Sequence, residues 1–70
     1  MRDVQITHEP VELYKILKFE GLVASGGEAK AVIADGLVLV NGVVETKKRK
    51  KIISGDIIQF GQEEVRVLHC

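Results

Sequence analysis

The sequence predicts an α+β fold in which two packed helices lie on a small, mainly antiparallel β-sheet. Two stretches carry apolar residues at helical spacing, and several β-branched runs are bounded by turn residues. These stretches follow one another in the order β-α-α-β-β-β-β, with the runs of strands separate from the pair of helices, which is typical of the α+β class. A chain of 70 residues is expected to form one domain, covering 1–70.

The first strand and the first helix are expected within the first twenty residues. Residues 2–6 alternate polar and apolar side chains, which predicts a short strand. Pro10 suits the first turn of a helix, because its missing N–H is not needed there. Apolar residues then recur at helical spacing, so a helix is predicted from about Pro10 to Glu20. Gly21 is expected to end it.

The second helix has a clear start and a clear end. Ser25 is the candidate N-cap, and Glu28 three residues later completes a capping box. Gly36 stands where a left-handed residue commonly ends a helix. The helix is therefore predicted from Ser25 to Gly36. Because only a short link separates the two helices, we expect them to pack against each other.

The second half of the chain predicts two β-hairpins. Asn41-Gly42 between two β-branched runs is the strongest short hairpin signal, with Asn41 as a left-handed turn residue. Gly61-Gln62 can form a second two-residue turn with glycine first, and Ser54-Gly55-Asp56 forms a further turn. The four strands expected around these turns are residues 37–40, 43–46, 57–60 and 63–68.

Charge is segregated along the chain, although the net charge is zero. Five of the ten basic residues stand together, and the ten acidic residues all lie elsewhere. Segregated charge steers a charged partner more than the total suggests. We therefore favour a nucleic acid as the ligand of this run, with an acidic protein surface or a merely solvated run as alternatives. The run consists of Lys47, Lys48, Arg49, Lys50 and Lys51.

The start of the second helix is the other candidate site. A helix leaves its first N–H groups unpaired and places partial positive charge there. Gly26 and Gly27 carry no side chain that would keep an anion from the backbone, and Lys30 one turn later can reach back toward Ser25. A phosphate would then meet N–H groups and a lysine together. Alternatively, the glycines only make the turn, since Glu28 already supplies a negative charge.

Few aromatic residues are available for stacking on bases. Tyr14 is expected beside Lys18 on the first helix, while Phe19 and Phe60 are expected in the core. Lys15 and Lys18 lie on the polar face of that helix and are possible additional contacts. Recognition should therefore depend on backbone phosphates and shape, which favours folded RNA over extended single strands.

The sequence offers no pattern for catalysis or metal binding. His8 and His69 lie near the two ends, and neither has a carboxylate, serine or cysteine at a useful spacing. We expect no enzymatic activity, no cofactor, no metal and no small-molecule substrate. Cys70 cannot form an intramolecular disulfide and is expected to be a free thiol. No apolar run approaches the ~20 residues that span a bilayer, so we expect a cytoplasmic monomer that does not enter a membrane.

Spaced residues of the second helix and the hairpin after it resemble the S4 RNA-binding domain, also called the αL motif. The resemblance covers about Val11 to Phe60. The sequence of residues 25–30 is most similar to the YbcJ-like group of small stand-alone bacterial proteins. The matching residues are Ser25-x-x-x-Ala29-Lys30-x-x-Ile33-x-x-Gly36-x-Val38-x-Val40-Asn41-Gly42, followed by Ser54-Gly55-Asp56-x-Ile58.

This resemblance implies an S4-like fold that binds structured RNA, such as ribosomal or transfer RNA, with the ribosome as one candidate partner. By position, Lys30 and the basic residues from Lys47 onward would face the RNA. Many members of the family carry arginine directly after the serine, where this chain has Gly26. RNA binding is therefore expected to depend more on backbone N–H groups and on the basic run. We expect none of the activity that fused catalytic domains give to the family's enzymes. The alternative remains a protein-interaction module whose basic run docks on an acidic partner.

Overall fold

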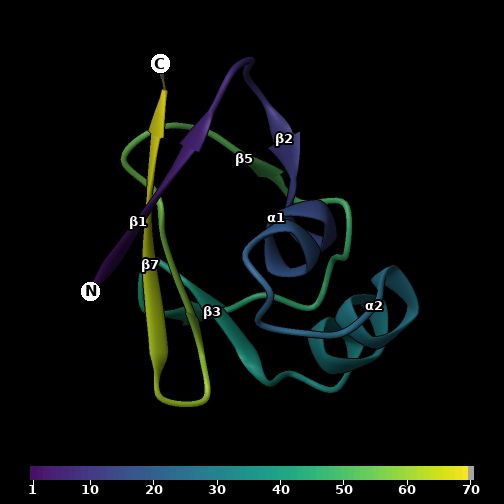
Figure 1. The fold of residues 1–70 in the computed structure, drawn as a ribbon. Coiled ribbons are helices and arrows are strands. Elements are labelled where there is room, and N and C mark those ends of the chain that lie inside the picture. Colours follow the sequence, from purple (N-terminus) through teal and green to yellow (C-terminus); the bar gives the residue numbers. More distant parts are fainter. Residues whose placement is uncertain (70) are drawn as a thin grey trace.

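The computed structural model describes residues 1–69 and contains seven strands and two helices there (Figure 1). Cys70, with its expected free thiol, lies outside the described residues. The helices are α1 (Leu13–Phe19) and α2 (Gly26–Ala34). The strands are β1 (Arg2–Ile6), β2 (Val11–Glu12), β3 (Val38–Val40), β4 (Val43–Val44), β5 (Lys51–Ile52), β6 (Ile57–Phe60) and β7 (Glu63–His69).

Five of these strands form one sheet in the order β1-β7-β6-β3-β4. The pairs β7–β6, β6–β3 and β3–β4 are antiparallel, and only β1 and β7 run parallel. Figure 1 shows the two helices together on one side of this sheet. The predicted α+β class with a mainly antiparallel sheet is confirmed.

The hydrophobic core lies between the helices and the sheet. On α1, the buried side chains are those at helical spacing, and on β7 they alternate with exposed ones, as the two periods require. Among residues 1–69, every buried side chain is apolar. The residues that are at most 1% exposed include Leu13, Ile16, Leu17, Ala29, Ile33, Val38, Ile52, Ile58, Val65 and Val67.

Both helices end where the sequence predicts. Gly21 and Gly36 have φ angles of 70° and 78°, and their N–H groups bond carbonyls of the preceding turn. Ser25 caps α2, because its Oγ accepts a hydrogen bond of 3.1 Å from the N–H of Glu28. The carboxylate of Glu28 accepts from the N–H of Ala24 at 2.7 Å, one residue earlier than in the usual capping box.

The two predicted hairpins are present. Asn41 and Gly42 have φ angles of 53° and 82°, as a type I′ turn requires. The side-chain amide of Asn41 also joins this hairpin to the start of β6: its Oδ1 accepts from the N–H of Ile57 and its Nδ2 donates to Asp56, both at 2.9 Å. Gly61, with a φ of 62°, is the first turn residue between β6 and β7.

The predicted start of the first helix at Pro10 is wrong. Helix α1 begins at Leu13, because residues 11–12 form β2 and pair with β5 in a separate two-stranded sheet. Val11 pairs with Ile52, and both side chains are buried, which favours the extended backbone over another helical turn. Strands of two residues are too short to show a period in the sequence.

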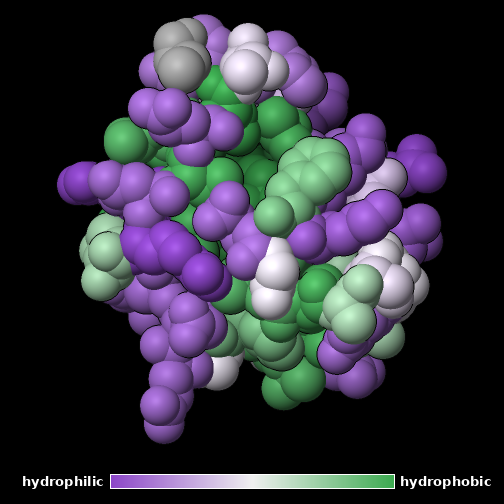
Figure 2. Space-filling model, viewed as in Figure 1, coloured by the Kyte–Doolittle hydropathy of each residue, from purple (hydrophilic) through white to green (hydrophobic). Residues whose placement is uncertain are grey.

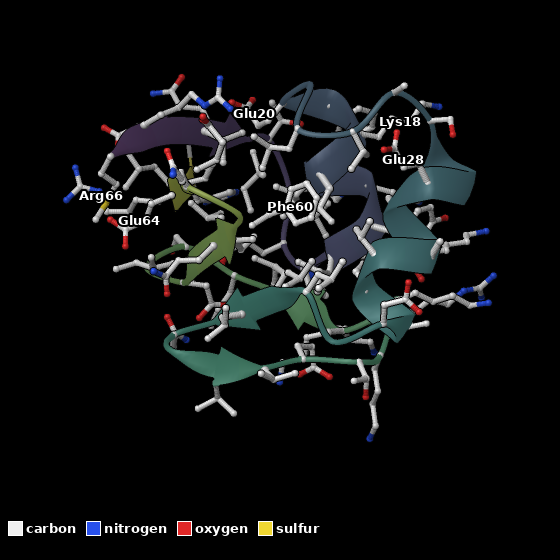
Figure 3. The ribbon with its side chains drawn as sticks, turned by 90° about the horizontal axis from the view of Figure 1, so that it is seen from below. Lys18, Glu20, Glu28, Phe60, Glu64 and Arg66 are labelled. Atoms are coloured by element: carbon white, nitrogen blue, oxygen red, sulfur yellow. The ribbon has the colours of Figure 1, made fainter. Side chains whose placement is uncertain are left out.

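The prediction of a buried Phe19 is also wrong. Phe19 is 70% exposed, whereas Phe60 is partly buried and packs against the core (Figure 3). A helix turns about 100° per residue, so Phe19 points about 200° away from the buried Leu17. Its ring is therefore free to meet a ligand.

The glycines divide into those that the backbone requires and those that it does not. Gly36→Ala should lower the free energy of unfolding by about 1–2 kcal/mol, the cost of placing a side chain in the left-handed region. Gly26→Ala is the matched control, since Gly26 lies in α2 without a positive φ and an added Cβ meets nothing within 4 Å. It should raise stability by up to ~1 kcal/mol. Urea denaturation measures both, and an equal loss in the two variants would contradict this division.

Candidate nucleic-acid interface

The basic loop (residues 47–51) is fastened by its backbone to the start of α1. The carbonyl of Lys50 accepts a hydrogen bond of 2.9 Å from the N–H of Leu13, and that of Lys48 accepts one of 3.1 Å from the N–H of Tyr14. A helix start leaves these N–H groups unpaired, and the residue before α1 makes no side-chain cap bond. The carbonyls of the basic loop thus replace a capping side chain.

The loop backbone is fixed, while its five cationic side chains are all exposed. The N–H of Lys50 bonds the carbonyl of Lys47 at 3.1 Å, which closes a turn, and the N–H of Lys47 bonds a carboxylate oxygen of Glu45 at 3.1 Å. The next residue, Ile52, is fully buried. The loop therefore holds the cations on an ordered backbone and presents them to solvent.

The carboxylate of Glu12 pairs with two cations of this region. Its oxygens are 3.3 Å from Nζ of Lys15 and 3.8 Å from Nε of Arg49, and its backbone pairs with Lys51. Glu12 thereby holds together a lysine of α1 and an arginine of the loop. The sequence alone does not show this role. The spacing of Glu12 and Lys15 on one helical turn was visible, but the contact with Arg49 depends on the pairing of β2 with β5.

Lys30 joins this region from α2. Its Nζ lies 4.8 Å from the centroid of the Tyr14 ring, within the range of a cation–π contact, and Lys15 lies 6.0 Å from the same ring. The cations over the Tyr14 ring are therefore Lys30 and Lys15. Lys18 lies one turn after Tyr14 on α1, and its predicted place beside Tyr14 stays a prediction. Tyr14 thus links Lys30 to the backbone of Lys48.

The start of α2 carries two glycines that the backbone does not require. Gly26 and Gly27 are helical, whereas the other five glycines have positive φ angles. A Cβ at Gly26 would meet nothing within 4 Å, and one at Gly27 would lie 3.8 Å from Oγ of Ser25, an ordinary contact. Ser25 itself is exposed and occupied as the cap. The helix start is therefore open on its outer side.

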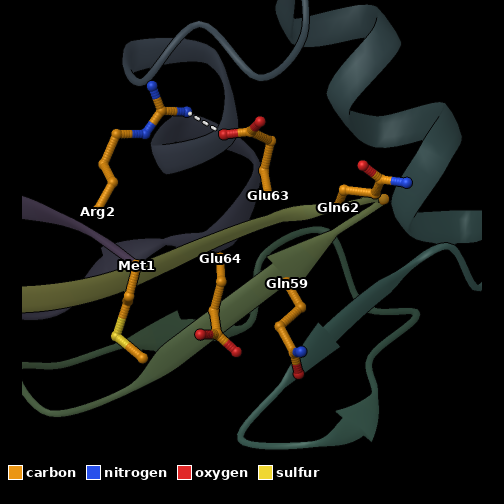
Figure 4. A pocket seen from close by; sticks show the side chains of 7 residues that line it. Met1, Arg2, Gln59, Gln62, Glu63 and Glu64 are labelled. Atoms are coloured by element: carbon orange, nitrogen blue, oxygen red, sulfur yellow. Dashed lines mark hydrogen bonds and ion pairs between the residues drawn. The ribbon is translucent and has the colours of Figure 1, made fainter.

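The other charged edge of the molecule is largely paired. Arg66 contacts Asp3 and Arg2 contacts Glu63, each at 3.2 Å, along the pair of β1 and β7. Figure 3 shows Arg66 and Glu64 at the opposite end of the molecule from Lys18 and Glu28. A surface hollow of about 570 Å³ opens beside the contact of Arg2 with Glu63 (Figure 4).

Within residues 1–69, no three His, Cys, Asp or Glu side chains are grouped so as to hold a metal ion. In the same part of the chain, neither helix has the length and apolar character needed to cross a bilayer.

Comparison with known proteins gives consistent matches. Residues 4–68 match the family described as the S4 domain. YbcJ of Escherichia coli (strain K12) is 48% identical over 61 residues, which cover 87% of each chain. A Bacillus subtilis (strain 168) protein named "Probable ribosome maturation protein RlbA" is 31% identical over 65 residues, covering 89% of this chain and 92% of that protein.

The fold is similar as well. The solution structure of YbcJ from E. coli, described as revealing an αL motif involved in RNA-binding, matches with a TM-score of 0.75 and 43% identity. The match covers 97% of this chain and 87% of that chain, so it includes the helices and the sheet. The predicted resemblance to S4 domains and to YbcJ-like proteins is confirmed. Sequence and fold agree, and the chain belongs to the S4 domain family.

Proposed function

We propose that this chain binds structured RNA through backbone phosphates, at a surface formed by the basic loop, Lys15, Lys30 and the start of α2. The observation that carries this proposal is the attachment of the loop backbone to α1, which presents five exposed cations on an ordered backbone, four of them in one turn and Lys51 at the start of β5. Membership of the S4 family and the likeness to YbcJ, whose αL motif is described as involved in RNA-binding, support RNA as the ligand.

The geometry favours shape over base sequence as the feature that is read. The cations come from three elements, α1, α2 and the loop, so they suit phosphates arranged in space rather than along one extended strand. Tyr14 lies beneath Lys30 and is partly buried, which leaves it little free face for stacking. Double-stranded RNA is recognised mainly through its backbone and shape. Folded RNA is accordingly the proposed class.

The start of α2 would contribute backbone N–H groups. Glycine costs stability inside a helix, and neither a positive φ nor a close neighbour explains Gly26 and Gly27. An approaching phosphate does explain them, because it would reach the first N–H groups without meeting a side chain. Ser25 and Lys30 would flank this phosphate, and the exposed Lys18 would extend the surface.

Ribosomal or transfer RNA is the proposed ligand, with the ribosome as the proposed partner. The relative from B. subtilis is named for ribosome maturation, and both RNAs present folded backbones. We propose a monomeric, non-catalytic module of one domain that acts in the cytoplasm, where these RNAs are found.

The proposal is tested by titrating the protein with a folded RNA hairpin, matched duplex DNA and heparin at two salt concentrations. Four to six phosphate contacts should give a slope of log affinity against log salt of about −3 to −5. Tighter binding to the RNA hairpin than to the other two ligands is expected. Equal binding to all three would contradict shape recognition and favour an acidic protein as the partner.

Removing two loop cations should reduce this slope. Lys47→Ala combined with Lys48→Ala should make the slope shallower by about 1.4–1.8, at ~0.7–0.9 per lost phosphate contact. The matched control is Arg2→Ala with Arg66→Ala, which removes the same charge from the edge where both arginines are paired. Salt titrations of RNA binding compare the two. Equal slopes in both double variants would remove the loop from the interface.

Closing the start of α2 should weaken binding without weakening the fold. Gly26→Glu places a carboxylate where the phosphate is proposed, and affinity for the RNA hairpin should fall about fivefold, equivalent to ~1 kcal/mol. Replacing a helical glycine and adding an acid to the first turn both favour the helix, so the unfolding free energy should not fall. Gly26→Ala controls for size alone. Wild-type affinity in the Gly26→Glu variant would leave the glycines without a role in binding.

Neutralising Glu12 should increase affinity for polyanions in general. Glu12→Gln keeps the size of the side chain but removes the negative charge that contacts Lys15 and Arg49. Heparin affinity should rise, and the salt slope should steepen by up to ~0.9, as one more cation becomes available. Glu64→Gln, on β7, is the matched control. The idea fails if the two variants bind heparin equally.

A further inference from the structure

An apolar groove of about 280 Å³ lies between β1 and α1. Figure 2 shows hydrophobic side chains gathered in this hollow. Phe19 borders it and is 70% exposed, so its ring contributes little to the core. The apolar side chains that line the groove are Val4, Ile6, Val11, Ile16 and Phe19.

The charges around the groove connect it to the basic loop. Lys15 lines the groove and is also bound to Glu12, which contacts Arg49 of the loop. Glu20, the acid that lines the groove, lies 3.9 Å from Arg2 and is partly neutralised. His8 completes the set of titratable groups there. The groove therefore opens beside cations that belong to the proposed phosphate surface.

Lys15 and Phe19 are four residues apart on α1, and residues at this spacing are neighbours on a helix surface. A ligand that places a phosphate at Lys15 can thus place an attached planar ring at Phe19. The groove is slightly smaller than the ~300–1,000 Å³ typical of small-molecule pockets, so it suits one ring system better than a peptide helix. A nucleotide combines these two groups.

We propose that the groove holds one unpaired base of the bound RNA, stacked on Phe19, while the phosphate of that nucleotide lies at Lys15. This inference rests on the proposed function and adds to it a site for a base from a bulge or a loop. Stacking accepts any base, because every base has a π-face. The site would therefore select RNA with an extruded nucleotide over uninterrupted duplex.

The test uses two RNA hairpins that differ only in one bulged nucleotide, which is 2-aminopurine. Phe19→Ala should lower affinity for the bulged hairpin by roughly 5- to 150-fold, corresponding to ~1–3 kcal/mol per stacked base. Affinity for the fully paired hairpin should not change. Phe19→Trp should preserve binding to both, and Leu37→Ala is the matched control, because Leu37 is 52% exposed and does not line the groove.

Fluorescence of the bulged 2-aminopurine gives a second readout. It should be quenched by the wild-type protein and by Phe19→Trp, and stay bright with Phe19→Ala. Equal affinity of wild type and Phe19→Ala for the bulged hairpin would overturn the base site and leave RNA binding intact. So would an equal loss for both hairpins. If the wild-type protein binds neither hairpin above its affinity for heparin, the proposed function itself fails.

Discussion

The bonding of the basic loop to the start of α1 is the constraint on which the rest of the surface depends. Five adjacent cations repel one another, so a loop without other contacts would adopt extended and variable conformations. Here the carbonyls of Lys48 and Lys50 are used by the N–H groups of α1, and Ile52 is buried directly after the loop. Each such hydrogen bond adds a net ~0.5–1.5 kcal/mol. The helix obtains its cap and the loop obtains its shape from the same contacts, so neither can be altered alone.

This attachment has a consequence for binding. Ordering a flexible loop at an interface consumes part of the interaction free energy, and a loop that is ordered beforehand avoids that loss. In the proposed complex, the exposed lysine side chains would follow the phosphates, while their positions along the backbone are set. Glu12 weakens the attraction of Lys15 and Arg49 for an anionic ligand, since its contacts partly neutralise both cations. A ligand must interact with Lys15 and Arg49 more strongly than the Glu12 carboxylate does. This requirement disfavours weakly binding anions.

Local signals were sufficient for some elements and insufficient for others. The N-cap at Ser25 and the turn at Asn41 depend on nearby backbone groups, so α2 and its hairpin were predicted from the sequence. The pairing of Val11 with Ile52 joins residues far apart in the chain, in strands of two residues, and no local period reveals it. The same distance effect hid the contact of Glu12 with Arg49 and that of Tyr14 with Lys30. Whether the predicted site residues contact RNA stays a prediction.

The zero net charge of the chain fits a polyanion ligand once the pairing of charges is considered. At the pair of β1 and β7, Arg2 and Arg66 are matched by Glu63 and Asp3, so that edge presents little net field. At the other side, the five loop cations are exposed and meet few acids. Such a distribution orients an approaching polyanion toward the loop, because opposite charges steer encounter while like charges repel wrong approaches. The neutral total therefore disfavours attraction of a polyanion to the whole surface, and the exposed loop cations favour the proposed face where α1, α2 and the basic loop meet.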